Sequence, residues 1–300
     1  IYNGPVSFRQ SATDANNQGI ATTYAGYFQD QLVFNRYWQA IFGVRYDRFE
    51  MDFTNNRTQQ NLLTYDNLVS PRGGLIFKPF GDNFSLYANY SIAYVPRAGE
   101  QLSSLTLSNQ SLKPEEFRNY ELGAKWDITP TFSTTLAFFQ LDRLNALATD
   151  PNNPAQSSLV DGQRTRGIEW GFSGNLTERW RVMGGYAYQD GEITKPVIFG
   201  SITAQPGANQ AQLPEHSFSL WNRYDINDRW GVGLGTIYRS KMYAAVDNSV
   251  TLPGFLRFDA AVYYQVSKNM QLQVNVENLF DKQYYATATN NTNIMPGSPI

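Results

Sequence analysis

Residues 270–277 read Met270-Gln271-Leu272-Gln273-Val274-Asn275-Val276-Glu277, with an apolar side chain at every second position. Side chains of a β-strand point alternately to the two faces of a sheet, so this pattern indicates a strand whose faces meet different surroundings. The same alternation runs through residues 84–94 and 119–128. These runs are close in length to the roughly 9–11 residues that a membrane-crossing strand needs. The alternation therefore predicts strands of membrane-spanning length.

The alternation recurs along the chain and predicts twelve antiparallel strands. They cover residues 21–33, 37–53, 68–78, 83–95, 117–129, 132–145, 164–176, 180–192, 216–227, 230–243, 255–266 and 270–280. Short turns join them on one side and longer polar segments on the other, as in a transmembrane antiparallel β-barrel. The predicted fold class is thus all-β. The long segments 96–116, 146–163, 193–215 and 244–254 should lie outside the cell, and the short turns in the periplasm.

An aromatic residue follows a short turn at nearly even intervals. These residues are Trp38, Phe84, Phe132, Trp180 and Trp230, and their spacing is 46 to 50 residues. Aromatic side chains prefer the headgroup level of a membrane, which makes such a series typical of an interface girdle. A soluble β-sandwich or propeller is the alternative, but it has no reason to place an aromatic after each turn.

The polar face of the predicted strands also carries charge, which suits a water-filled lumen better than a packed core. The charged positions are Glu121, Lys125, Arg181, Arg223, Asp225, Arg257 and Asp259.

The composition excludes several classes of function. Only 17% of the residues are charged, against roughly 25% in average globular chains. The net charge of −2 argues against nucleic acid as a partner. The chain has no Cys and only His216, so that Cys–His catalysis and most metal sites are unavailable to it. No run of 18 apolar residues exists that would form a membrane helix. We expect neither an enzyme nor a metal site.

Four motifs carry a family resemblance. The segment from Asn275 to Tyr285, with Asn275, Asn278, Leu279, Phe280 and Asp281, resembles a stretch near the C-terminus of TonB-dependent outer-membrane receptors. Residues 71–74, 112–115 leading to 120–123, and 166–169 leading to 174–177 resemble other parts of the same family. Within the family, the sequence looks most like the siderophore receptors, and the catecholate branch among them. The motif residues are structural in this interpretation.

The resemblance implies a 22-stranded barrel with a plug in its lumen, the arrangement of plugged transporters. Residues 1–300 would be a partial barrel domain, the C-terminal half, with the plug and the final strand outside the chain. The implied function is uptake of a ferric siderophore across a Gram-negative outer membrane. Energy would come from the TonB complex, which would contact an N-terminal part of the protein outside this chain. Iron would travel within the ligand, and no protein cofactor is expected.

Other functions stay open at this point. A passive outer-membrane porin is one alternative, although porins lack the motif at residues 275–285. The same family with haem, cobalamin or carbohydrate as cargo is a second. A third is an adhesin or phage-binding surface built on the long loops. The sequence does not identify the chelator, and a plug domain upstream would decide the transporter class.

Ligand-binding candidates lie near the outer end of the predicted strands. An anionic ferric siderophore with flat groups can be held by aromatic side chains and by Arg or Lys. Extending the alternation of 230–243 turns Arg239, Lys241 and Tyr243 inward, and Arg97 follows strand 83–95. The alternative for each is a lumen salt bridge or an aromatic anchor at the interface. The apolar face should contact outer-membrane lipid and lipopolysaccharide.

Overall fold

The structure is a computed structural model that describes residues 16–96, 113–149, 157–160, 162–199 and 202–299. In this part of the chain twelve strands form one sheet, in which each strand pairs antiparallel with the next one along the order. They are β1 (Asn17–Val33), β2 (Trp38–Asn55), β3 (Gln60–Phe77), β4 (Phe84–Val95), β5 (Glu115–Thr129), β6 (Phe132–Leu144), β9 (Gln163–Asn175), β10 (Trp180–Ile193), β13 (His216–Asp225), β14 (Trp230–Arg239), β17 (Phe255–Ser267) and β18 (Met270–Val276).

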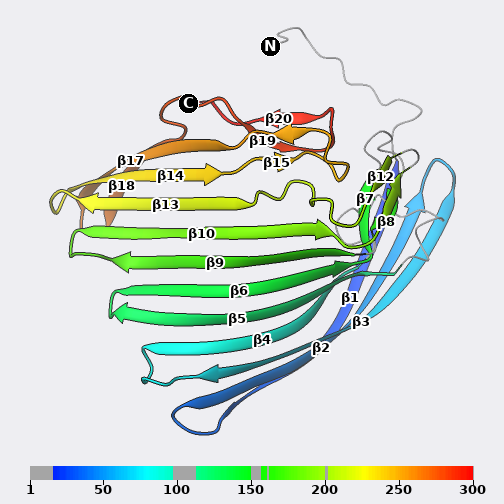
Figure 1. Ribbon diagram of the computed structural model, residues 1–300, viewed down its shortest axis with the longest axis horizontal. Helices are drawn as coiled ribbons and strands as arrows, with labels where there is room; N and C mark the ends of the chain where they lie inside the picture. The colour runs from blue at the N-terminus through cyan, green and yellow to red at the C-terminus, as the bar shows by residue number, and fades with distance from the viewer. Residues whose placement is uncertain (1–15, 97–112, 150–156, 161, 200–201, 300) are drawn as a thin grey trace.

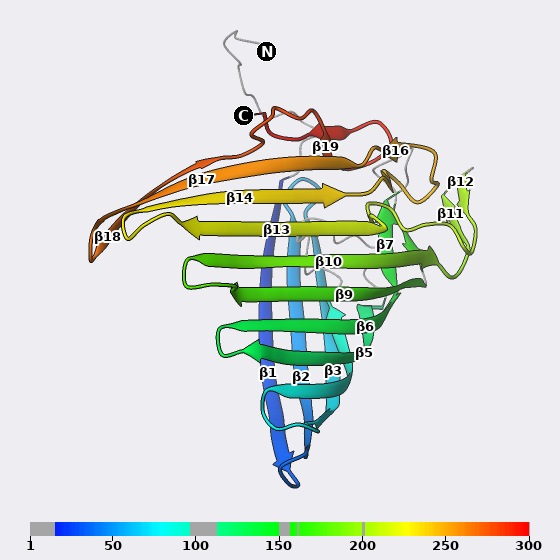
Figure 2. The same ribbon diagram turned by 60° about the vertical axis from the view of Figure 1, so that its left-hand side comes forward.

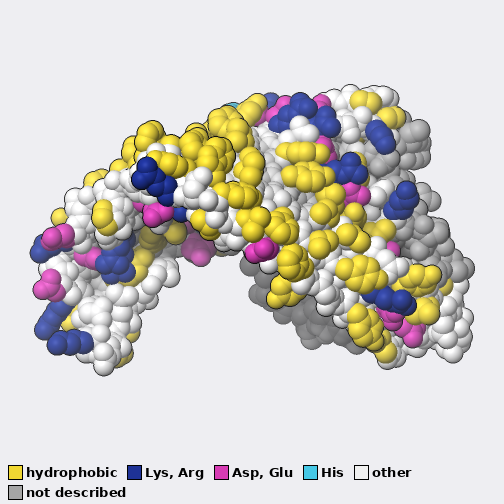
Figure 3. All heavy atoms as spheres, turned by 90° about the horizontal axis from the view of Figure 1, so that it is seen from below, with side chains coloured by type: hydrophobic (Ala, Val, Ile, Leu, Met, Phe, Trp, Pro, Cys, Tyr) yellow, Lys and Arg dark blue, Asp and Glu magenta, His cyan; other side chains and the backbone are white. Residues whose placement is uncertain are grey.

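The sheet coils strongly, so that β1 to β3 cross the direction of β9 to β14 (Figures 1 and 2). Seen from below, the molecule is an arch with a hollow on its concave side, and hydrophobic side chains gather over the convex side (Figure 3). We call the concave side the inner face and the convex side the outer face. No helix in the described residues is long and apolar enough to cross a membrane.

The two ends of the sheet differ in their connections. Four short hairpins extend from one end of the sheet, toward the upper middle and the right of Figure 1. They are β7 (Ala146–Thr149) with β8 (Ser157–Val160), β11 (Val197–Phe199) with β12 (Ile202–Ala204), β15 (Met242–Tyr243) with β16 (Thr251–Leu252), and β19 (Tyr285–Ala288) with β20 (Ile294–Pro296). We call this the loop end and the opposite one the turn end. The predicted asymmetry of connections is confirmed, whereas the side of the membrane that each end faces stays a prediction.

The twelve predicted strands are all present, and four of them differ from the prediction by four or more residues at one end. Strand β1 begins at Asn17 rather than at residue 21, because its pairing with β2 continues to Asn17 opposite Asn55. Strand β3 begins at Gln60 rather than at residue 68, because Phe49, Met51, Phe53 and Leu62 bury each other and extend the hairpin. Strand β14 ends at Arg239 rather than at residue 243, because the next residues form the separate hairpin of β15 and β16. Strand β18 ends at Val276 rather than at residue 280, because Asn278 has a φ of 54°.

Three turns share one mechanism that positions the aromatic girdle. The side-chain oxygen of Asn35 accepts hydrogen bonds from the backbone N–H groups of Tyr37 and Trp38, at 2.8 and 3.0 Å. Thr177 caps the N–H of Trp180 in the same way, and Asn227 caps that of Trp230. Short polar side chains bind nearby backbone groups readily and so fix turns. The cap sets each tryptophan as the first residue of its strand.

The two faces of the sheet differ in polarity as the alternation predicts. Large apolar side chains on the outer face are exposed, for example Leu122 at 59%, Phe138 at 50% and Val274 at 66%. The inner face carries the charged positions that the alternation assigns to the lumen, and there Asp225 accepts hydrogen bonds from both Arg181 and Arg223 at 2.9 Å. A sheet with one apolar face and one charged face fits a position between two different surroundings, hydrocarbon on one side and water on the other.

Candidate ligand-binding site

Arg239 ends β14 on the inner face, at the loop end. It pairs in register with Ser217 and Phe255. Its Nη1 donates to the carbonyl oxygen of Ala286 and its Nη2 to that of Tyr285, both at 2.6 Å. The guanidinium also lies over the Phe255 ring, 4.9 Å from the centroid. Arg239 therefore points inward as predicted, but it binds the chain segment that follows β18, which we call the returning segment.

Arg257 holds the same returning segment from the next strand. Its Nη1 donates to the Tyr284 hydroxyl and its Nη2 to Asp259 Oδ2, both at 2.8 Å. The Tyr284 ring packs on Phe255 with 4.3 Å between centroids. We call Arg239, Phe255, Arg257 and Tyr284 the clamp. The two rings pack on each other and each also meets one guanidinium, which is the combination of groups predicted for binding a flat anion.

Asn278 fixes the point where the chain turns back toward the clamp. Only 1% of this residue is exposed. Its Nδ2 donates to the carbonyl oxygens of Lys282 and Ser298, at 3.1 and 2.9 Å, and its Oδ1 accepts from the Lys282 N–H at 2.9 Å. Its backbone N–H donates to Asp259 Oδ1 at 2.8 Å. The asparagine of the motif therefore shapes the backbone.

Other residues of the motif also have structural contacts. The Leu279 N–H donates to the Phe258 carbonyl oxygen at 2.7 Å, and the Asp281 N–H donates to the Asn278 carbonyl oxygen at 2.8 Å. Phe280 is 71% exposed and meets the Phe258 ring edge-on on the outer face. Asn275 lies within β18, opposite Ala261.

Two donors in the clamp have no hydrogen bond among the described residues. Nε of Arg239 and Nε of Arg257 are both buried and unpaired. An unmade hydrogen bond at a buried donor costs about 1–3 kcal/mol, so such atoms mark places where a further acceptor would be stabilising. Because both atoms are covered, a ligand would reach them only after the groups that cover them moved away.

Lys241 and Tyr243 do not continue the strand, contrary to the alternation used to place them. The sheet ends at Arg239, and the Ser240 N–H donates to the His216 carbonyl oxygen at 2.8 Å. Lys241 is exposed beyond this point. Tyr243 lies in β15, and its carbonyl oxygen accepts from the Gln212 N–H at 2.7 Å. Arg97 lies outside the described residues.

Contacts between loops complete the site, and no alternation or motif in the sequence predicts them. Gln212 Oε1 accepts a hydrogen bond from the Thr287 hydroxyl. The N–H of Asn209 donates to Asn248 Oδ1 at 2.9 Å, and Asn291 Nδ2 donates to Asp247 at 2.9 Å. A small apolar core lies beneath these contacts and contains Met242, Ala244, Leu252 and Ala288. Loops 193–215, 240–254 and 281–299 are thus joined.

The inner wall offers a second polar cluster on β4 and β5. The Tyr87 hydroxyl donates to Glu121 Oε1, and the Lys125 ammonium lies 5.4 Å from the centroid of the Tyr87 ring. A Cβ on Gly123 would come within 2.5 Å of that ring. The glycine of the segment 120–123 therefore makes room for Tyr87. In the described part of the chain, no three His, Cys, Asp or Glu residues gather as they would around a metal ion.

A protein-family model and curated relatives from other bacteria both match this chain. The family model described as TonB dependent receptor-like, beta-barrel matches residues 1–279. The metal-pseudopaline receptor CntO of Pseudomonas aeruginosa is 32% identical over 298 residues, which cover 95% of this chain and 40% of the relative. The probable TonB-dependent siderophore receptor PiuA of Acinetobacter baumannii is 30% identical over 279 residues, covering 87% and 37%.

Solved structures show the same similarity. The siderophore receptor PiuA from Acinetobacter baumannii superposes with a TM-score of 0.82 at 26% identity, over 94% of this chain and 42% of that one. The ferric-catecholate import receptor Fiu of Escherichia coli K12, in its closed form, gives 0.78 at 26% identity, over 95% and 44%. The chain thus spans about two fifths of the length of the curated relatives that it matches.

Proposed function

The chain belongs to the TonB-dependent receptor β-barrel family, and on that premise we propose that it is part of an outer-membrane receptor for ferric siderophores. The proposed location is a Gram-negative outer membrane, with transport energised through TonB. The support for the cargo is that relatives from different bacteria are named as siderophore receptors. No protein cofactor is part of the proposal, because the iron travels within the ligand.

The same premise extends to the rest of the barrel. We propose that residues 1–300 form the C-terminal half of a 22-stranded barrel, with the plug and the closing strand contributed by other parts of the protein. The observation that supports this is the state of the sheet edges. Among the described residues β1 pairs only with β2, and β18 pairs only with β17. Unpaired backbone groups are very costly in hydrocarbon, so both edges need further strands.

The observation that carries the cargo proposal is the clamp at the loop end. Two guanidinium groups and two aromatic rings meet there on the inner face. An anionic iron chelate gains charge-assisted hydrogen bonds from guanidinium groups and stacking contacts from the rings. Lys241 is exposed just beyond the clamp and would meet an incoming anion first.

Binding of ferric siderophores to the purified full-length receptor tests this proposal. Titrations should cover catecholate and hydroxamate iron chelates. Lys241→Gln should weaken binding of the preferred chelate by no more than about fivefold, because an exposed charge contributes up to about 1 kcal/mol. Arg239→Gln should weaken it further, because it removes the partly buried cation of the clamp.

A control pair lies at the turn end, where Arg179→Gln and Arg229→Gln should leave the dissociation constant unchanged. Far-UV circular dichroism and migration on unheated gels would show that each variant keeps the barrel. If Arg239→Gln and Lys241→Gln together bind every chelate as tightly as the unmodified receptor does, the clamp is purely structural. If the unmodified receptor binds no ferric siderophore at all, the cargo proposal is wrong.

A further inference from the structure

Three of the four clamp residues lie on strands, and the fourth lies on the returning segment. Arg239 ends β14, and Phe255 and Arg257 lie at the start of β17. Tyr284 belongs to the returning segment, which reaches these strands through hydrogen bonds from the two guanidinium groups and through a ring contact. The strands therefore hold three groups in place, and the returning segment supplies what occupies them.

The returning segment offers these three groups the chemistry of a ligand. The Tyr284 ring packs on Phe255 with 4.3 Å between centroids, and its hydroxyl oxygen accepts a hydrogen bond from Arg257 at 2.8 Å. The backbone carbonyl oxygens of residues 285 and 286 accept from Arg239 at 2.6 Å. A flat ring that carries oxygen, with two further acceptor oxygens beside it, thus fills the site.

A glycine of the returning segment makes room for the same ring. A Cβ on Gly297 would come within 2.0 Å of the Tyr284 ring. The Gly297 N–H also donates to the Tyr284 carbonyl oxygen at 2.8 Å. The position of the ring therefore depends on Gly297 as well as on Phe255.

The two arginines of the clamp differ in their charged partners. Arg257 forms an ion pair with Asp259 at 2.8 Å. In the described part of the chain Arg239 forms no ion pair, and its acceptors are neutral carbonyl oxygens. An anionic oxygen attracts a guanidinium more strongly than a neutral carbonyl oxygen does. An anionic ligand would therefore compete with the returning segment for Arg239.

Open space borders the contact between the returning segment and the strands. One recess of about 460 Å³ is lined by Arg239 and Phe255 among other residues. Another, of about 610 Å³, is lined by residues 281–285 and 296–299 together with Pro253 and Gly254. The returning segment is thus not packed on every side, and its movement away from the strands would leave the sheet intact.

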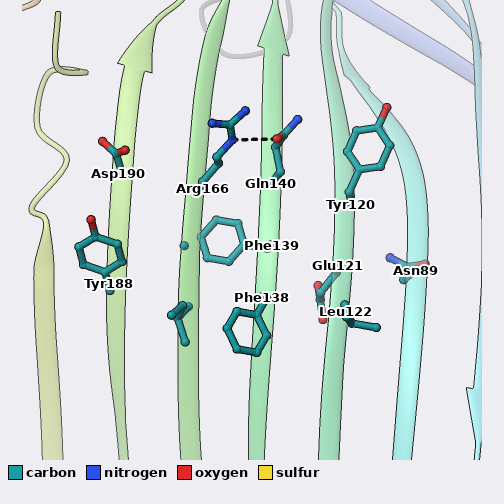
Figure 4. Close-up of a pocket in the computed structure, with 12 residues that line it drawn as sticks. Asn89, Tyr120, Glu121, Leu122, Phe138, Phe139, Gln140, Arg166, Tyr188 and Asp190 are labelled. Atoms are coloured by element: carbon teal, nitrogen blue, oxygen red, sulfur yellow. Dashed lines mark hydrogen bonds between the residues drawn. The ribbon is translucent and has the colours of Figure 1, made fainter. Parts of the chain in front are cut away.

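The recess in Figure 4 does not offer an anion the same chemistry. It measures about 650 Å³ and crosses β4, β5, β6, β9 and β10, and Arg166 is the one cation among its lining residues. Glu121 and Asp190 also line it, and Arg166 Nε donates to the Gln140 side chain at 2.9 Å. Two carboxylates beside one cation disfavour an anion there.

We propose that the returning segment is an internal occupant of the ligand site and that the ferric chelate displaces it. A ring of the chelate replaces the Tyr284 ring on Phe255, and its anionic oxygens replace the carbonyl oxygens at Arg239. The receptor is closed without ligand, and binding releases the returning segment from the strands. The observed affinity is then the intrinsic affinity reduced by the cost of opening. The inference rests on the proposed function, because it describes the regulation of the same site.

Titration of the purified full-length receptor with ferric dihydroxybenzoate tests the displacement. Tyr284→Phe should tighten binding about tenfold, because it removes a hydrogen bond to a charged group that holds the closed form. Gly297→Ala should also tighten binding, because its Cβ pushes the Tyr284 ring out of place. Tyr285→Phe, at an exposed position, should stay within about twofold. Weaker binding by Tyr284→Phe and Gly297→Ala would make Tyr284 a ligand contact and would overturn the inference.

A cross-link that holds the returning segment closed should have the opposite effect. The Thr287 hydroxyl donates to Gln212 Oε1, and the chain has no native Cys. Gln212→Cys with Thr287→Cys, joined by a short bifunctional maleimide, should bind roughly tenfold or more weakly after cross-linking than before, because the closed form cannot open. Asn209→Cys with Asn248→Cys joins two other loops that are in contact and should change by less than about twofold. Unchanged binding in both cross-linked forms would show that the returning segment need not move.

Hydrogen exchange distinguishes displacement from closure over the ligand. Ferric dihydroxybenzoate should speed exchange at residues 284–288, and slower exchange there would overturn the inference. If the receptor binds another ferric chelate but no variant binds ferric dihydroxybenzoate, Tyr284 does not stand in for the ligand, and the inference alone is wrong. If no form of the receptor binds any ferric chelate, the proposed function itself is wrong.

Discussion

The Arg257 guanidinium donates a hydrogen bond to the Tyr284 hydroxyl, with 2.8 Å between Nη1 and the oxygen. This bond joins strand β17 to the segment that follows β18, across 27 residues of sequence. Asp259 binds the other end of the same guanidinium and the backbone of Asn278. The site is therefore built on a strand, and the returning segment is fastened to it by side chains.

Removing the Tyr284 hydroxyl should loosen this segment without disturbing the sheet. Tyr284→Phe keeps the ring on Phe255 and deletes the acceptor of Arg257. The expected loss is about 1.5–3 kcal/mol of unfolding free energy, as for a hydrogen bond to a charged group. Hydrogen exchange of the full-length protein should accelerate at residues 284–298. Tyr285→Phe, at an exposed position, is the control, and equal exchange in both variants would mean that the bond does not hold the segment.

Asn278 should tolerate little change, because it combines buried hydrogen bonds with a left-handed backbone. Asn278→Ala loses the side-chain bonds to Lys282 and Ser298 and puts a Cβ-bearing residue at a φ of 54°. We expect a loss of about 2–4 kcal/mol, of which about 1 kcal/mol is the backbone cost that Asn278→Gly avoids. Denaturant unfolding in lipid vesicles measures both. Asn275→Ala, within the strand, should cost far less; a cost equal to that of Asn278→Ala would contradict the account.

Arginine substitutions along β18 should separate the two faces. Leu272 and Val274 are 51% and 66% exposed on the outer face, so that Leu272→Arg and Val274→Arg place charge in hydrocarbon. Each should cost about 2–4 kcal/mol near the membrane midplane. Gln271→Arg and Gln273→Arg point to the inner face and should cost much less. The yield of folded, heat-modifiable barrel measures the difference. If both pairs of substitutions reduce this yield equally, both faces of the strand are packed against apolar groups and the two-faced account of β18 is wrong.

Single cysteines should react according to the end of the sheet on which they lie. The chain has no native Cys, so each label reports one position within it. Ser249→Cys is exposed between β15 and β16 at the loop end, and Asp228→Cys is exposed at the turn end. A membrane-impermeant maleimide added to intact cells should label the first and not the second. Labelling of Asp228→Cys alone would reverse the proposed orientation.

Periodicity predicted the strands well because membrane strands must alternate over their full length. It failed where a strand leaves the two-solvent environment, as at Gln60, where β3 continues beyond the predicted start. The apolar residues there pack against each other on the inner face, so that the alternation no longer separates lipid from water. For the same reason, the alternation of β14 does not continue to Lys241 and Tyr243, which lie beyond the end of the sheet.

The clamp was only half predictable. The alternation of apolar and polar residues places Arg239 and Arg257 on the inner face, because each lies within a regular strand. Their partners lie in residues 284–286, which have no alternation and meet the strands through long-range contacts. The motif around Asn278 marks a bend, but only the structure shows that the bend directs Tyr284 onto Phe255.

Energised uptake tests the central claim most directly. The full-length receptor would be expressed in cells that lack other siderophore receptors, and accumulation of a radioactive ferric siderophore would be followed with and without a protonophore. We predict accumulation that stops when the proton gradient is lost or TonB is deleted, while binding of the chelate at the cell surface persists. Accumulation that continues undiminished under both conditions would contradict the account and would identify a passive pore instead.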